Sequence, residues 1–356
     1  MDSKPKLYAN KIEKYWKNQK PPNISTLKST NQKFTDPYFP PNINSITSRD
    51  SSGKFTDSQL GPQALDDMED ENPGSSTRLI WKRCTEIEPK WEVFEGKIEF
   101  SDVNQGNLGD CYFLSAITAL TEFPYLISEK FRTTKFNKEG YYEMIFFIDG
   151  EWQVVFVDDY FPYDPQSKNW AYALPHNNEL WAMLLEKAWA KLNGGYSNVI
   201  GGIVSEPISC LTGFPTQYIV HENYESDELF EMIEEGGKKG TIMSSASKAE
   251  SMIERKGLVM GHAYTLMHAK AWRERKIYLV KLRNPWGEKE WTGNWSDKSP
   301  KWTEEYKKFF GFVNANDGIF WISIDDYMNY FDATYICYLL YGATIKSYHF
   351  EYPKYF

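Results

Sequence analysis

A cysteine at the start of one predicted helix and a histidine on a distant predicted strand constrain this fold most. Cys111 follows the glycine-containing segment QGNLGD, residues 105–110, and opens an amphipathic stretch. His262 lies about 150 residues further along the chain, beside small neighbours. A fold that uses both side chains together must pack the start of that helix against the strand that carries His262.

Hydrophobic periodicity predicts the elements around these two residues. Phe113, Ile117 and Leu120 recur at helical spacing, so a helix is expected from Gly109 to Leu126, with Pro124 ending it. The other predicted elements are a helix over 179–192, a hairpin over 141–157 that turns at Asp149-Gly150, and paired strands over 262–269 and 276–283.

Cys111 has the surroundings of a nucleophile. Backbone N–H groups and the helix dipole at the first turn of a helix favour a thiolate over a thiol. Gln105 lies six residues upstream, where its amide and the Cys111 N–H can both donate to an oxyanion. The alternative is that Cys111 is a small buried apolar side chain, as most free cysteines are.

A thiolate enzyme needs a base, and His262 is the best candidate among the five histidines. Gly261 and Ala263 leave room around its ring, and its separation from Cys111 is close to the roughly 130–150 residues typical of papain-like proteases. His268, six residues on and with the same strand parity, is the main rival and is expected to be a hydrogen-bonded structural histidine. The other three are expected at the surface.

Asn284, at the end of the second predicted strand, is the candidate that orients the base. An amide oxygen can fix the tautomer and the ring orientation of an imidazole. Pro285 stiffens the turn, and Trp286 can shield the Asn–His hydrogen bond from water. An isolated Asn-Pro is usually only a turn; the ordered set Gln105, Cys111, His262 and Asn284 carries the functional interpretation.

Charge and cysteine content exclude several classes of protein. The formal net charge is −9, which gives no electrostatic reason to expect nucleic-acid binding. The four cysteines form no CxxC pair, and free thiols are typical of a reducing compartment. The start of the chain lacks an apolar signal sequence, and no apolar stretch is long enough for a transmembrane segment. A cytoplasmic location is therefore expected.

Eight blocks of sequence, in order, resemble the calpain family of calcium-regulated cysteine proteases over roughly residues 34–340. They are FTDPYFPP (34–41), IWKR (80–83), QGNLGDCYFL (105–114), LEKA (185–188), GHAY (261–264), RNPWGE (283–288), WTG (291–293) and DG (317–318). The resemblance implies limited endoproteolysis of protein substrates. It further implies that Gln105 is the oxyanion donor, that Trp286 shields the base, and that Gly202 and Gly261 bind substrate backbone.

The resemblance also implies an α+β, papain-like fold with the active site in a cleft between two subdomains. The expected divisions are a flexible leader at 1–33, a cysteine-bearing subdomain at 34–213, a β-rich subdomain with His262 and Asn284 at 214–342, and a tail at 343–356. The polar stretch 45–77, with its acidic cluster, is expected to be a solvated loop. The sequence leaves open whether the chain is a core fragment or a short form, and whether a regulatory subunit or inhibitor protein binds it.

The family's two calcium sites map onto carboxylates of this chain. The resemblance places Asp102 and Glu179 in the first site and Glu290, Asp297 and Asp317 in the second. Two charged positions of the family, which pair across the subdomains, are apolar here: Phe100 and Ile319. Either these two pack together and align the cleft without calcium, or the second site is weak, so calcium dependence is expected to be altered.

Two other functions stay open on the sequence alone. A non-catalytic scaffold with this fold is possible, although all the active-site positions are present. A transglutaminase-type acyl transferase also uses a Cys–His pair, but such enzymes usually orient the histidine with Asp, and Asn284 stands against that.

Overall fold

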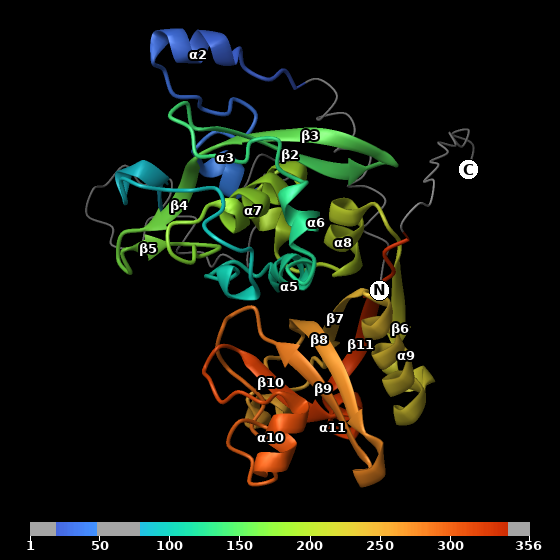
Figure 1. The fold of residues 1–356 in the computed structure, drawn as a ribbon. Coiled ribbons are helices and arrows are strands. Elements are labelled where there is room, and N and C mark those ends of the chain that lie inside the picture. The colour runs from blue at the N-terminus through green and yellow to red at the C-terminus, as the bar shows by residue number, and fades with distance from the viewer. Residues whose placement is uncertain (1–18, 48–78, 341–356) are drawn as a thin grey trace.

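The structure is a computed structural model that describes residues 19–47 and 79–340 (Figure 1). The predicted leader up to residue 18, the acidic part of the predicted polar loop and the predicted tail lie outside these residues. The helices are α2 (Ile24–Thr30), α3 (Ile43–Ile46), α5 (Cys111–Leu120), α6 (Pro124–Ser128), α7 (Trp181–Leu192), α8 (Ser205–Thr212), α9 (Ser226–Lys239), α10 (Glu304–Phe310) and α11 (Ile324–Tyr330).

The strands form three sheets. A small sheet has the order β1-β4-β5, a hairpin pairs β2 with β3, and a six-stranded sheet has the order β10-β9-β8-β7-β11-β6. Their bounds are β1 (Ile80–Arg83), β2 (Tyr141–Ile148), β3 (Glu151–Asp158), β4 (Tyr160–Asp164), β5 (Asn169–Trp170), β6 (Thr216–Val220), β7 (Ile242–Ser247), β8 (Ala263–Trp272), β9 (Ile277–Arg283), β10 (Ile319–Ser323) and β11 (Phe331–Cys337).

The first part of the chain builds a helical core around α5 and α7. Every residue of α7 is buried, and so is every residue of α5 except Cys111. The β2–β3 hairpin lies across this core, as Figure 1 shows, and turns at Asp149 and Gly150, both with positive φ. A positive φ at both central residues is what a tight two-residue hairpin turn requires, so the predicted hairpin is confirmed.

The later part of the chain builds the six-stranded sheet, which Figure 1 shows below the helical core. Strands β8 and β9 pair antiparallel across a charged turn, η6 (Arg273–Arg275), as predicted. The α+β class is therefore confirmed. The sequence position at which the two parts divide, near Gly213, stays a prediction; Gly213 caps α8 in a left-handed conformation with φ 75°.

The prediction that Pro124 ends the first helix was wrong. Helix α5 ends at Leu120, and Pro124 is the first residue of α6. Proline is tolerated at that position because the N–H that it lacks has no partner within a helix.

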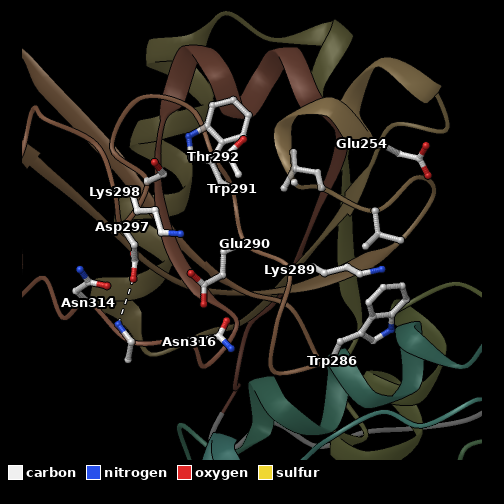
Figure 2. Close-up of a pocket in the computed structure, with 15 residues that line it drawn as sticks. Glu254, Trp286, Lys289, Glu290, Trp291, Thr292, Asp297, Lys298, Asn314 and Asn316 are labelled. Atoms are coloured by element: carbon white, nitrogen blue, oxygen red, sulfur yellow. Dashed lines mark hydrogen bonds between the residues drawn. The ribbon is translucent and has the colours of Figure 1, made fainter.

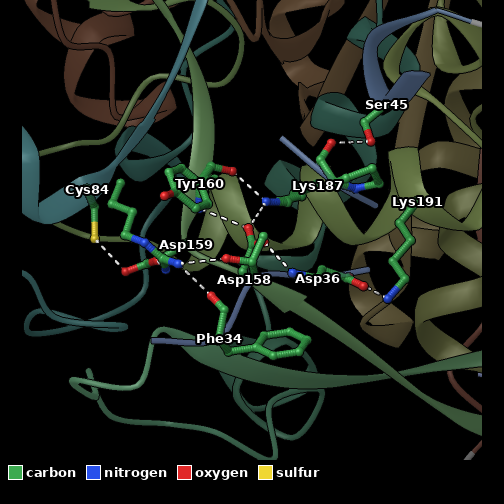
Figure 3. Close-up of polar contacts among 12 residues, drawn as sticks. Phe34, Asp36, Ser45, Cys84, Asp158, Asp159, Tyr160, Lys187 and Lys191 are labelled. Atoms are coloured by element: carbon green, nitrogen blue, oxygen red, sulfur yellow. Dashed lines mark hydrogen bonds and ion pairs between the residues drawn. The ribbon is translucent and has the colours of Figure 1, made fainter. Parts of the chain in front are cut away.

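A buried ionic network holds the segment after α2 inside the molecule (Figure 3). The Lys191 ammonium bonds to Asp36 and to the Phe156 carbonyl, at 2.6 Å each, and Lys187 pairs with Asp158. The Asp36 N–H also donates to Asp158, at 2.7 Å. Both ion pairs are fully shielded from solvent. Helix α7 is therefore tied to residues about 150 positions earlier in the chain.

Part of the predicted leader is ordered in the structure. Helix α2 is capped by the side chain of Asn23, and Ile24 and Leu27 pack against a small cluster around Phe34. In the described part of the chain, no helix is long and apolar enough to cross a membrane.

Candidate active site

Cys111 is the first residue of α5 and is partly exposed. The Ala263 N–H, at the start of β8 and next to His262 in the chain, acts to lower the pKa of its thiol, so the sulfur lies close to the start of that strand. Burial raises the pKa of this thiol to about 11, against the lowering effect of that N–H. In this arrangement the sulfur is a protonated thiol.

His262 is buried and forms one hydrogen bond with the candidate orienting residue. Its Nε2 lies 2.8 Å from Asn284 Oδ1. An amide oxygen only accepts, so Nε2 carries the proton and Nδ1 is left as the basic nitrogen. Burial lowers the pKa of His262 to about 4, while the bond to Asn284 acts to raise it.

The Asn284 amide is itself held in one orientation. Its Nδ2 donates to the Lys289 carbonyl at 3.1 Å, and its Oδ1 also accepts from the Trp286 N–H at 3.1 Å. The Trp286 ring lies against the imidazole of His262, with centroids 5.0 Å apart. Asn284 is fully buried, so its bond to His262 is kept from water.

Contacts between α5 and the sheet bring these groups to one place. Thr265 on β8 donates to the Ser115 carbonyl on α5 at 3.0 Å, and the hydroxyls of Ser115 and Ser244 lie 3.1 Å apart. Among the hydrogen bonds of the described residues, none joins Cys111 to His262. The structure thus brings the start of α5, with Cys111, against the strand that follows His262, without a direct hydrogen bond between these two candidate residues.

Gln105 lies on the loop before α5, against the turn that carries Asn284. Its backbone N–H donates to the Pro285 carbonyl at 3.0 Å. One N–H of its side-chain amide is used by the Leu108 carbonyl, at 2.6 Å. Among the hydrogen bonds of the described residues, none joins Gln105 to the Cys111 sulfur; its second amide N–H is the group that could serve an oxyanion.

The two candidate substrate-binding glycines are both exposed near Cys111 and His262. A side chain at Gly202 would lie only 2.5 Å from the ring of Tyr112, the residue after Cys111, so this surface must stay bare. Gly261 has φ 54°, a conformation that favours glycine. Its N–H bonds to the Lys248 carbonyl at 3.0 Å.

The first predicted acidic set is brought together. Asp102 and Glu179 are both buried, and each raises the electrostatic cost of ionising the other, so burial and this repulsion raise the pKa of Glu179 to about 7. Glu179 Oε2 is buried without a hydrogen-bond partner. A buried, partnerless oxygen beside a second carboxylate fits a hard cation such as calcium.

The second predicted acidic set lines a pocket of about 700 Å³ in part (Figure 2). Glu290 accepts the N–H groups of Asp317 and Gly318, and Asp297 accepts that of Ala315. Within residues 19–47 and 79–340, no three acidic, histidine or cysteine side chains converge closely enough to hold a metal ion. In this arrangement Glu290, Asp297 and Asp317 do not fit calcium together.

Arg283 was not singled out from the sequence, yet it lies between the two acidic sets. It is 2% exposed and donates to the Val103 carbonyl at 3.1 Å, just before Gln105. Its guanidinium faces the Phe100 ring at 5.5 Å, and Ile319 is its direct partner on β10. Directly opposed residues on antiparallel strands project to one face, so both apolar replacements flank this arginine. The sequence feature that could have identified Arg283 is its position immediately before Asn284.

His268 and His221 have surroundings that differ from those of His262. A register shift in β8 between Leu266 and His268 removes the expected shared parity, and His268 is exposed, with its ring toward Trp321. His221 was wrongly expected at the surface. It is buried, and its ring nitrogens bond to the Phe331 carbonyl and the Thr334 hydroxyl, each at 2.8 Å.

Comparisons with known proteins agree with this geometry. The profile of the calpain family cysteine proteases matches residues 34–338. The chain is 35% identical to the calpain-type cysteine protease DEK1 of Zea mays over 315 residues, which are 85% of this chain and 14% of that protein. It is 33% identical to calpain-8 of Rattus norvegicus over 325 residues (85% and 42%), and 37% identical to calpain clp-4 of Caenorhabditis elegans over 276 residues (73% and 38%). The chain thus spans less than half the length of these relatives.

Proposed function

The chain belongs to the calpain family of cysteine proteases, and on this premise we propose that it is a cysteine endopeptidase with Cys111 as nucleophile, His262 as base and Asn284 as the residue that orients the base. The observation that carries the proposal is the buried 2.8 Å bond between His262 Nε2 and Asn284 Oδ1. It leaves Nδ1 as the proton acceptor on a ring that lies beside the start of α5.

The chemistry follows from these positions. His262 Nδ1 takes the proton of Cys111, and the thiolate attacks the carbonyl carbon of the scissile peptide bond. The Cys111 N–H and the free Gln105 amide N–H donate to the oxyanion. The imidazolium then protonates the leaving amine, and water attacks the acyl-enzyme with His262 again as base.

Burial opposes the charged forms of both groups in the arrangement described here. The thiol pKa is about 11 and the imidazole pKa about 4, so proton transfer from Cys111 to His262 is unfavourable. A small change at the cleft that joins the sulfur to Nδ1 would favour the thiolate–imidazolium pair, because each charge then stabilises the other. The enzyme is therefore expected to need a movement of its two halves relative to each other before it turns over.

We further propose that calcium is the ligand whose binding promotes this movement of the two halves. Asp102 and Glu179 are the residues that would hold it, supported by the unpartnered Glu179 oxygen. Calcium would supply positive charge to a buried acidic pair. The second site, with Glu290, Asp297 and Asp317, is expected to be weak, since Ile319 supplies no further carboxylate.

The experiment is hydrolysis of a fluorogenic peptide across a calcium titration that starts from excess chelator. Wild type should cleave the peptide, and Cys111→Ala should abolish turnover while the circular dichroism spectrum is unchanged. Cys210→Ala is the matched control, because Cys210 is also a partly buried free thiol and lies on α8, outside the motifs of the candidate site. Activity that survives in Cys111→Ala would contradict the assignment.

The same titration separates the remaining possibilities. Activity in chelator would mean a cleft aligned without calcium. Failure to hydrolyse peptide at any calcium concentration, combined with slow alkylation of Cys111, would favour a scaffold. Limited cleavage of cytoplasmic proteins is the proposed role, and the free thiols of Cys84, Cys111, Cys210 and Cys337 support a reducing compartment.

A further inference from the structure

Two buried carboxyl groups lie directly beneath the first turn of α5. Asp110 immediately precedes Cys111 and is completely buried, and Glu186, in the middle of α7, is 2% exposed. Glu186 accepts the Ala173 N–H at 2.9 Å. Neither Asp110 side-chain oxygen accepts a bond from an N–H or hydroxyl group of the described residues. The group that each meets is the other carboxyl.

The carboxyl groups of Asp110 and Glu186 must share a proton. Two ionised carboxylates in contact, away from water and without a cation, would repel each other strongly. Burial is the main cause that raises the pKa of Asp110 to about 7, and it raises the pKa of Glu186 well above its ordinary value. At neutral pH, Glu186 is therefore the protonated partner and donates to Asp110.

The other ionisable groups that interact with this pair are one thiol and two hydroxyls. They belong to Cys111 and Tyr112 on α5 and to Tyr196 on η3 (Tyr196–Val199). No cation of the described chain contributes to the pKa of either carboxyl. The pair thus depends on its shared proton alone.

The side chain of Asp110 does not cap α5, although aspartate at the N-cap position usually does. Asp110 is the N-cap residue of α5, where a carboxylate normally accepts from the N–H groups one turn into the helix. Here it makes no such bond. The backbone N–H groups of Cys111 and Tyr112 instead act to lower the pKa of the Cys111 thiol.

We propose that Glu186 is a positioning residue for the nucleophile: by donating a hydrogen bond to Asp110, it holds that side chain beneath α5 and leaves the first-turn N–H groups to the Cys111 sulfur and to the oxyanion. The proposal rests on the proposed function, in which Cys111 is the nucleophile. Without Glu186, the Asp110 carboxylate turns to cap α5, which removes donors from the sulfur and places a negative charge against it.

The test measures alkylation of Cys111 by iodoacetamide as a function of pH, in a Cys210→Ala background, with the labelled site identified by mass spectrometry. Glu186→Ala should slow alkylation near pH 8 about tenfold, the effect of losing about one hydrogen bond to the thiolate. It should also move the pH profile to higher pH. Glu186→Gln, whose amide can still donate to Asp110 and accept from Ala173, should keep most of the rate.

A second variant excludes simple damage to the fold. Adding Asp110→Ala to Glu186→Ala removes both the charge and the oxygen that would cap the helix, so the alkylation rate should recover while the urea midpoint need not. Wild-type alkylation in Glu186→Ala, or no recovery in the double variant, would overturn the proposal. Alkylation does not require turnover, so an expected alkylation pattern without peptide hydrolysis would reject the proposed function alone.

Discussion

Helix α7 carries two buried clusters of charged residues that differ in their balance. On one side, Lys187 and Lys191 meet Asp158 and Asp36, so each buried cation has a buried anion. Glu186 projects roughly 100° further around the same helix and meets Asp110, an acid against an acid. Both clusters are almost fully shielded from solvent.

The difference separates a structural role from a functional one. Paired charges of opposite sign stabilise each other's ionised forms and hold segments together, although burial still lowers the pKa of Lys191 to about 8. A pair of carboxyl groups avoids two adjacent negative charges only while it holds a proton, so its state follows pH. The balanced cluster anchors residues 34–36, and the unbalanced pair lies beneath the proposed nucleophile.

The largest effect is expected from breaking the balanced cluster. Lys191→Met leaves Asp36 ionisable, buried and without its cation, so the free energy of unfolding should fall by about 3–5 kcal/mol. Urea unfolding monitored by tryptophan fluorescence gives this value. Lys191→Met combined with Asp36→Asn should lose less, because no charge is then stranded; an equal or larger loss would show that the stranded charge is not the cause of the destabilisation.

A smaller, pH-dependent effect is expected from the unbalanced pair. The pKa of Asp110 is about 7 in the folded state, above the ordinary 3.8. The folded state therefore holds a proton that the unfolded state releases between these values, and stability is lost as pH rises through that window. Between pH 5 and pH 8, wild type should lose roughly 1–3 kcal/mol more than Asp110→Asn. Parallel pH profiles for the two proteins would contradict this prediction.

The smallest effect is expected from an exposed ion pair, which is neither buried nor made of two like charges. Lys239 and Glu235 form an i, i+4 ion pair on α9, with both side chains more than half exposed. Water and salt screen such a pair. Lys239→Ala should therefore leave the urea midpoint and the alkylation profile of Cys111 unchanged, which calibrates the two larger effects.

Periodicity and motif order predicted much of this molecule. The helix that begins at Cys111, the helix over α7, the hairpin and the β8–β9 pair depend on local patterns, and all appear. The bond between His262 and Asn284 also follows the predicted order of side chains. The expected shared strand parity of His262 and His268 was wrong, because a single register shift in β8 reverses which face a residue occupies.

The groups that sequence reasoning missed are defined by contacts across long separations. Nothing near Glu186 in the sequence indicates that Asp110 will meet it, and the motif that contains Glu186 also contains Lys187, which serves the opposite cluster. Arg283 likewise acquires its position only when β9 meets the loop at Val103. The three carboxylates of the second acidic set were placed by resemblance, and their mutual distances depend on loops whose conformation no local pattern specifies.

Arg283 and the neighbouring turn determine how the proposed active site would lose its activity. The loop of Gln105 is held to the turn of Asn284 by the bond to the Pro285 carbonyl and by Arg283 on Val103. Gln105, the proposed oxyanion donor, and Asn284, proposed to orient the base, are thus parts of one mechanical unit, although they are far apart in the sequence. A displacement between the two halves removes both functions together, so the site should switch between competent and incompetent states without a half-active intermediate.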